Sequence, residues 1–132
     1  MDKPLPKPDF LTAPFWQSLR DGVFTLPTCK DCGKAHFYPR PDCPHCGSEA
    51  IEWKPASGRG TVYSFTVVHR APSPAFKADV PYVVAIVETE EGPHLMSRLT
   101  GIAPDVVRVG MPLKVRLEAV AEAIVLPMFE AA

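Results

Sequence analysis

The four cysteines of this 132-residue chain form two Cys-x-x-Cys pairs that lie close together in the sequence. The first pair is Cys29 and Cys32, the second is Cys43 and Cys46, and glycine follows each pair directly. A Cys-x-x-Cys turn points two sulfurs at one centre, and glycine permits the positive φ that closes the turn. Two such turns facing each other make a tetrahedral four-thiolate site, which suits Zn²⁺. The spacing therefore predicts structural zinc, because no coordination position is left open for catalysis.

Three other uses of the cysteines stay as alternatives. Two disulfides would require an oxidising compartment, to which nothing in the sequence points. A thioredoxin-like redox pair needs one Cys-x-x-Cys motif, whereas two are present in tandem. Rubredoxin-type iron is the nearest alternative, because Cys-Pro-x-Cys-Gly is also a rubredoxin knuckle, although rubredoxin separates its knuckles by a longer segment. His36 and His45 are expected to be spectators, because four sulfurs already fill the site.

Composition limits the remaining fold and the class of partner. A hydrophobic content of 46% supports one moderate core, and sixteen prolines argue against long helices. The formal net charge is −1, and four thiolates with one Zn²⁺ add −2, which gives −3. This balance disfavours a nucleic-acid-binding protein.

The first residues and the apolar runs bear on localisation. The chain starts with prolines alternating with charged residues and lacks an apolar segment of signal-peptide length. No apolar run approaches the length of a membrane span. We therefore expect a cytoplasmic protein, where thiols stay reduced and available to a metal.

A short helix is expected before the first knuckle, after an extended arm over residues 1–11. Thr12 can cap the helix, Pro14 suits its first turn, and Gly22 ends it. One apolar face results, made of Phe15, Trp16 and Leu19. We expect this face to be exposed and to dock within the protein, in a dimer or on a partner.

The elements of the metal-binding segment and of the remaining chain follow from β-branched and aromatic runs. Short strands are expected over 23–26, 36–40 and 51–54 around the knuckles. After a turn at 55–58, five strands are expected over 61–68, 82–88, 94–99, 112–118 and 124–129. Periodicity alone predicts a small β-barrel or sandwich, and five antiparallel strands with a break after the third are typical of an OB-type barrel.

One stretch carries a resemblance to a known family. The run Ser57-Gly58-Arg59-Gly60-Thr61-Val62-Tyr63-Ser64, with residues 81–85 and 110–112, resembles the zinc-ribbon plus OB-fold proteins associated with thiolases, long catalogued as a domain of unknown function. The resemblance implies a mainly β fold with a short N-terminal helix, a rubredoxin-like zinc ribbon and a five-stranded OB-fold barrel. It implies segments over 1–22, 23–56 and 57–132 in that order. The chain departs from the family in having one N-terminal helix where many members have two.

The same resemblance implies binding of acyl-CoA or CoA and a complex with a thiolase-like or sterol-carrier-type thiolase enzyme. A CoA site needs cations for phosphates and an apolar slot for the pantetheine arm. Candidate residues are Arg59, Phe65, His69, Arg70, Phe76, Lys77, Tyr82 and Arg98. Arg59 and the His69-Arg70 pair come first, because they flank the strand with the family signature. Phe65 and Tyr82 are equally compatible with an ordinary barrel core.

A catalytic role for the chain itself is disfavoured by its inventory of residues. The sequence contains neither a Gly-x-Ser-x-Gly elbow nor a phosphate-binding glycine loop, and the metal site uses every cysteine. We therefore expect a non-catalytic accessory subunit in acyl-CoA metabolism. The alternative is a nucleic-acid module, since ribbons and OB barrels both occur in such proteins. Against it, residues 61–99 carry more acidic than basic side chains.

Overall fold

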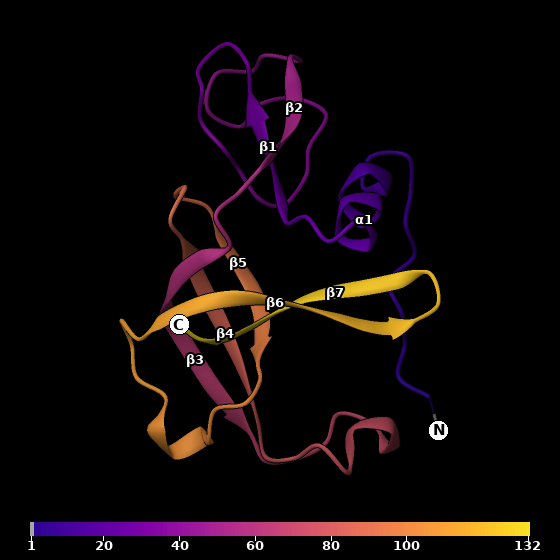
Figure 1. Ribbon diagram of the computed structural model, residues 1–132, viewed down its shortest axis with the longest axis vertical. Helices are drawn as coiled ribbons and strands as arrows, with labels where there is room; N and C mark the ends of the chain where they lie inside the picture. The colour runs from indigo at the N-terminus through magenta and orange to yellow at the C-terminus, as the bar shows by residue number, and fades with distance from the viewer. Residues whose placement is uncertain (1) are drawn as a thin grey trace.

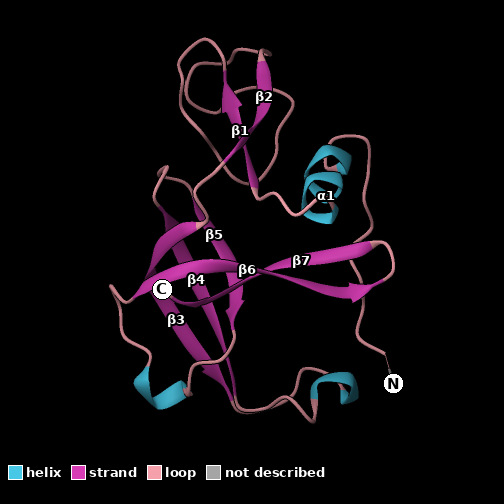
Figure 2. Ribbon diagram, in the orientation of Figure 1, coloured by secondary structure: helices cyan, strands magenta, loops and turns pink. Residues whose placement is uncertain are grey.

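Two units make up the structure, a two-stranded ribbon and a closed five-stranded barrel, with one short helix beside the ribbon (Figure 1). The computed structural model describes residues 2–132, and Met1, the first residue of the expected arm, lies outside the described residues. Strands dominate, as Figure 2 shows, and the helical elements are short. Among the residues described, no helix has the length and apolar character needed to cross a membrane.

The helix α1 spans Ala13–Arg20 and begins one turn after Asp9. The Asp9 carboxylate accepts a hydrogen bond from the Thr12 backbone N–H at 2.8 Å, and the Thr12 hydroxyl accepts one from the Asp9 N–H at 3.1 Å. Thr12 is the N-cap residue, as expected, but its side chain makes no capping hydrogen bond because it is turned back toward Asp9. Gly22, with φ 84°, follows the helix as expected.

The ribbon is an antiparallel pair of β1 (Thr25–Cys29) and β2 (Ile51–Pro55). The prediction of a strand over 36–40 is wrong. Next to this segment, the structure has only an isolated bridge, between Thr28 and Ala35. Prolines at 39 and 41 lack the N–H groups that a paired strand requires. The segment instead turns toward the helix.

An aromatic cluster joins the helix to the ribbon. Phe15 is 4% exposed, and its ring centroid lies 5.6 Å from that of Phe37, 5.7 Å from Trp53 and 6.4 Å from Phe24. Leu19 is buried as well, at 1% exposure. Both residues therefore pack within the protein's own core, which is one of the expected uses of this face, and the expected exposure is wrong for them.

The barrel comprises β3 (Arg59–Val68), β4 (Tyr82–Thr89), β5 (His94–Leu99), β6 (Pro112–Ala121) and β7 (Ile124–Ala131). Their order around the barrel is β3-β4-β5-β7-β6, with single-turn 3₁₀ helices at Pro74–Phe76 and Pro104–Val106. The expected five-stranded OB-type barrel is thus confirmed. All pairings are antiparallel except that of β5 with β7, whose register contains the single pair Leu99 and Phe129.

Two glycines of the family signature are required where β3 enters the barrel. Gly58 has φ 78°, and a Cβ at this position would lie 2.5 Å from Val115 Cγ1. A Cβ on Gly60 would lie 2.6 Å from the backbone oxygen of Glu88. Glycine at both positions therefore allows β3 to pass closely between β4 and β6.

Candidate metal centre and binding groove

The four cysteine sulfurs converge at one end of the ribbon. All four lie within 4.8 Å of one another, with Cys29 Sγ 3.6 Å from Cys46 Sγ and Cys32 Sγ 3.7 Å from Cys43 Sγ. A tetrahedron with Zn–S bonds of about 2.3 Å has sulfur–sulfur edges of roughly 3.8 Å. The sulfurs therefore fit a tetrahedral Zn²⁺ site, as expected from the sequence, and such an ion would hold the two knuckles together.

The two knuckles have the same backbone hydrogen bonds, which explains the glycine after each pair. Gly33 N–H donates to Cys29 O at 2.9 Å, and Gly47 N–H donates to Cys43 O at 2.8 Å. Both glycines have positive φ, 76° and 80°. Each turn aims a backbone N–H at its first sulfur, from Cys32 to Cys29 Sγ at 3.4 Å and from His45 to Cys43 Sγ at 3.3 Å.

At Cys29 the backbone amide favours the thiolate form that binds a metal. The N–H of Cys32 is the largest influence on the Cys29 thiol and lowers its pKa to about 7, from an ordinary 9.0. The His45 ring is directed elsewhere, because its Nε2 lies 3.3 Å from the carbonyl oxygen of Ala35. His45 therefore ties the second knuckle to the intervening segment instead of completing the ligand set.

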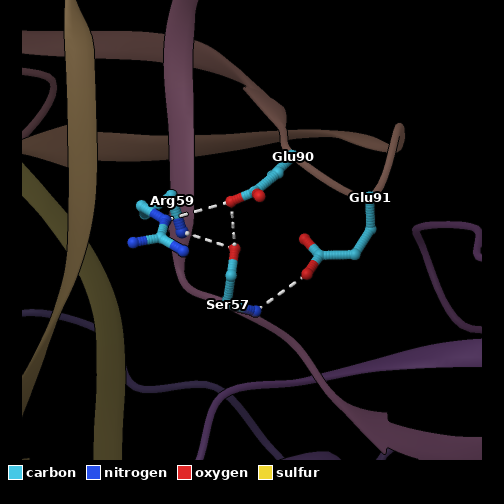
Figure 3. A network of polar contacts seen from close by, with 4 residues as sticks. All are labelled: Ser57, Arg59, Glu90 and Glu91. Atoms are coloured by element: carbon cyan, nitrogen blue, oxygen red, sulfur yellow. Dashed lines mark hydrogen bonds and ion pairs between the residues drawn. The ribbon is translucent and has the colours of Figure 1, made fainter.

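A polar network joins the connection between β2 and β3 to the β4–β5 turn (Figure 3). The Arg59 Nε donates to Glu90 Oε2 at 3.1 Å, and the Ser57 hydroxyl donates to the same oxygen at 2.9 Å. The Ser57 backbone N–H donates to Glu91 Oε2 at 2.8 Å. Arg59 and then Ser57 hold the pKa of Glu90 below its ordinary value. Arg59 is therefore engaged with the β4–β5 turn.

The predicted CoA-binding cations do not form one cluster. Arg59 starts β3 and His69 follows its end, so about ten residues separate them, roughly 30 Å of extended strand. Arg59 and the His69-Arg70 pair therefore lie at opposite ends of β3, as expected of residues that flank this strand. Phe65 lies opposite the buried Ala85 and packs against the hydrophobic core.

Three of the predicted residues do meet, on the outer surface of the barrel. The Phe76 and Tyr82 ring centroids lie 6.1 Å apart, and the Arg98 guanidinium lies 4.5 Å from the centre of the Tyr82 ring. They line a groove of about 570 Å³, which Trp16 also lines. The described residues that line this groove do not include His69, Arg70 or Lys77, which are exposed on the β3–β4 connection.

The N-terminal arm lies in the same groove. Lys3 Nζ is 2.8 Å from Asp79 Oδ2, which also accepts a hydrogen bond from Arg98 Nη1 at 3.0 Å. The Lys3 ammonium lies 5.6 Å from the centre of the Phe76 ring, and Pro4 and Leu5 continue along the groove. The Asp79 carboxylate thus links the arm to Arg98, one of the cations predicted to bind CoA.

Most of the groove is apolar, and this apolar portion was not predicted from the sequence. Its exposed apolar side chains come from the arm, the ribbon, β5 and β6, namely Leu5, Tyr38, Met96 and Val120. Alternation in β5 offered one signal, because Leu95 and Leu99 are buried and Met96 must then face outward. The long β6–β7 hairpin that forms another wall had no such local signal.

Taken together, the site and the fold define a rubredoxin-like zinc ribbon followed by an OB-fold barrel. Comparison with protein families agrees, since residues 16–52 match the rubredoxin-like zinc ribbon domain of ChsH2 and residues 53–118 match its C-terminal OB-fold domain. The chain belongs to this ChsH2 family of zinc-ribbon and OB-fold proteins, which includes DUF35 domain-containing scaffold proteins.

Several relatives differ in length from this chain. A probable enoyl-CoA hydratase alpha subunit of Thermomonospora curvata is 42% identical over 120 residues, which cover 89% of this chain and 37% of that protein. A DUF35 domain-containing scaffold protein of Pyrococcus furiosus is 35% identical, over 76% of this chain and 73% of the relative. The benzoylsuccinyl-CoA thiolase subunit BbsA of Geobacter metallireducens is 34% identical, over 55% and 47%. The chain thus spans little more than a third of the first relative.

A solved structure matches nearly the whole chain. A chain of the Ltp2-ChsH2(DUF35) aldolase superposes with a TM-score of 0.87 at 36% identity, covering 96% of this chain and 98% of that one. The helix, the ribbon and the barrel therefore occur together in that solved structure. Its name contains a second component, Ltp2.

Replacement of Cys32 by Ser should abolish metal binding, because three sulfurs leave the tetrahedral site incomplete. We expect faster amide hydrogen exchange over residues 23–54, with the barrel strands still protected, since the barrel is closed by pairing among its own five strands. The matched control His45→Gln should keep its metal. Full metal content in Cys32→Ser, measured by elemental analysis, or loss of barrel protection would contradict this assignment.

Asp79 should control the position of the arm in a pH-dependent way. Lys3, followed by Arg98, lowers the pKa of Asp79 below its ordinary 3.8. The ion pairs are therefore complete at neutral pH and are lost as the pH falls through this lowered value. Asp79→Asn should release the arm at neutral pH, seen as sharper and shifted amide signals over residues 2–8, whereas Asp105→Asn should not. Unchanged signals in Asp79→Asn would show that the apolar contacts alone hold the arm.

Proposed function

We propose that the chain is a non-catalytic accessory subunit that presents acyl-CoA to a thiolase-like enzyme. The observation that carries this proposal is the groove in which Phe76, Tyr82 and Arg98 meet beside Trp16. Aromatic rings, one cation and an apolar floor are what a CoA thioester needs, since it combines an adenine, phosphates and a thin apolar arm.

The chemistry of the thioester would belong to the partner. Every cysteine of the sequence lies in the metal site. A thiolase requires a thiol nucleophile, so the partner must supply it. A four-sulfur site also leaves no position at which zinc could activate water or polarise a carbonyl.

Arg98 is the best placed cation for a phosphate. Its guanidinium lies against the Tyr82 ring, and its hydrogen bond to Asp79 is one that an incoming phosphate oxygen could replace. The acyl and pantetheine portions would then run along the apolar part of the groove past Met96 and Val120. Binding would displace the arm, because Lys3 and Leu5 occupy this path.

A protein partner is supported by the relatives. One is named a subunit of a CoA thiolase, others are named scaffold proteins, and the matching structure is an assembly with Ltp2. The groove wall offers an anchor for such a partner, because Trp16 is only half-buried and Tyr38 and Met96 are exposed nearby, at 60% and 58%. A ligand in the groove would thus lie at the edge of the docked enzyme.

Arg98→Ala should weaken binding of acetyl-CoA and of a longer acyl-CoA by roughly ten- to a hundredfold, because a charge-assisted hydrogen bond contributes about 1.5–3 kcal/mol. Calorimetry measures this effect, with Arg116→Ala on the exposed face of β6 as the matched control. Equal weakening in both variants would mean that general charge, and not the groove, attracts the ligand. Binding of single-stranded nucleic acid without any thioester binding would replace the proposal with the nucleic-acid alternative.

Trp16→Ala should weaken the complex with the enzyme by at least tenfold while leaving its structure and metal content intact, because central aromatic anchors dominate interfaces. A pull-down or surface-binding assay with the purified partner measures it, and circular dichroism confirms the fold. Val109→Ala, which removes a 68% exposed side chain outside the groove, is the control. An unchanged complex in Trp16→Ala would remove the helix from the proposed interface.

A further inference from the structure

Residues 2–8 of the N-terminal arm are attached to the rest of the molecule by side chains alone. Prolines at positions 4, 6 and 8 lack the N–H group, and within the described chain no backbone hydrogen bond forms over residues 2–8. Most of this segment is exposed, and even Leu5, which lines the groove, is 46% exposed. A segment with few buried contacts and no backbone ladder opens at little cost in free energy.

The arm is nevertheless fixed at both ends, so it crosses the groove in one register. At its base, Asp9 and Thr12 exchange hydrogen bonds of 2.8 and 3.1 Å beside the start of α1. At its tip, the Lys3 ammonium contacts Asp79 on the β3–β4 connection. Six residue steps separate Lys3 from Asp9, which is about 19 Å of the extended conformation that alternating prolines favour. Figure 1 shows this path, from α1 past the β6–β7 hairpin toward the 3₁₀ helix at Pro74–Phe76.

The bound arm covers surfaces that a ligand of the groove would use. The Lys3 ammonium lies 5.6 Å from the centre of the Phe76 ring, so one face of this ring is closed to a stacking ligand. The Asp79 carboxylate that Lys3 contacts also accepts a hydrogen bond from Arg98 at 3.0 Å. An incoming anion must therefore compete with a carboxylate for the guanidinium. Leu5 adds an apolar side chain to the adjoining part of the groove.

We propose that the arm is an autoinhibitory strap, which occupies the groove in the absence of a ligand and lowers its apparent affinity. This inference rests on the groove that carries the proposed function, and it adds that the chain itself supplies a competitor. An extended peptide has the narrow shape of a pantetheine arm, so the two exclude each other from the same path. The apparent dissociation constant then equals the intrinsic constant divided by the fraction of molecules with an open groove.

The test uses full-length, zinc-loaded variants in which the arm is released. Lys3→Met removes the ion pair, Leu5→Ser removes the apolar contact, and the double variant removes both. Lys7→Met is the matched control. Lys7 is an exposed lysine of the same arm that does not line the groove and forms no ion pair with another described residue.

The first probe is anilinonaphthalene sulfonate, whose apolar rings and anionic group suit the groove without any assumption about CoA. Fluorescence titration gives its affinity, and circular dichroism confirms that each variant is folded. We expect about threefold tighter binding with Lys3→Met, the size of a partly exposed ion pair, and about tenfold in the double variant. Lys7→Met should bind like the unmodified protein. The sign is informative, because loss of a positive charge would otherwise weaken binding of an anion.

Two results of this titration would overturn the proposal. Equal affinity in the double variant and the unmodified protein would show that the arm does not compete for the groove. Weaker binding with Lys3→Met would show that Lys3 serves the ligand as a second cation.

A synthetic peptide of residues 2–9 gives the converse test. At millimolar concentration, which is comparable to the effective concentration of a tethered segment, the peptide should displace the probe from the double variant. It should displace less from the unmodified protein, whose own arm already competes. No displacement from the double variant would mean that this segment does not bind the groove.

Acetyl-CoA distinguishes a failure of this proposal from a failure of the proposed function. Tighter binding of the sulfonate, with no binding of acetyl-CoA by any variant, would refute the proposed function and support the strap. Binding of acetyl-CoA with one affinity in all variants would refute the strap and leave the proposed function intact. Tighter binding of both probes in the double variant would support both.

Discussion

The convergence of four sulfurs on one centre is the constraint on which the ribbon depends. Its sheet has two strands of five residues, too little to stabilise the unit without further links. A tetrahedral ion fixes the distance between the knuckles, and the knuckles fix the segment that carries His36, Phe37 and Tyr38. Phe37 in turn contacts Phe15 of the helix. A wall of the groove, formed by Phe37 and Tyr38, therefore depends on geometry set at the metal.

The metal site and the strands were predictable because their signals are local. The spacing of the cysteines defines a turn within five residues. In β3 to β7, apolar residues alternate with polar ones because one face of each strand is buried. The candidate ligand site was predictable only in part. Arg59 and Arg70 are near in the sequence, but an extended strand separates them, whereas Phe76, Tyr82 and Arg98 meet across a loop and two strands. The position of the arm could not be predicted from the sequence, because its ion pair joins two residues that are far apart in the chain, Lys3 and Asp79.

The helix shows a related limit of sequence patterns. Helical spacing identified the face made of Phe15, Trp16 and Leu19, but periodicity does not say what covers such a face. In the structure the ribbon and β7 cover Phe15 and Leu19, and Trp16 at the margin of the cluster keeps part of its surface free. The same three residues thus provide two buried core side chains and one partly exposed side chain, and only their packing distinguishes them.

The seam between β5 and β7 gives the barrel uneven mechanical stiffness. Long antiparallel ladders join β3 to β4, β4 to β5 and β6 to β7, and three register pairs join β3 to β6. The seam between β5 and β7 has one register pair, the bond from Thr100 N–H to Phe129 O, and the bond from Ser97 Oγ to Pro127 O. The groove has β5 on one side of the seam and the β6–β7 hairpin on the other. Few hydrogen bonds across this seam would therefore oppose a small hinge motion of the hairpin, and such a motion would change the width of the groove while the longer ladders stay intact.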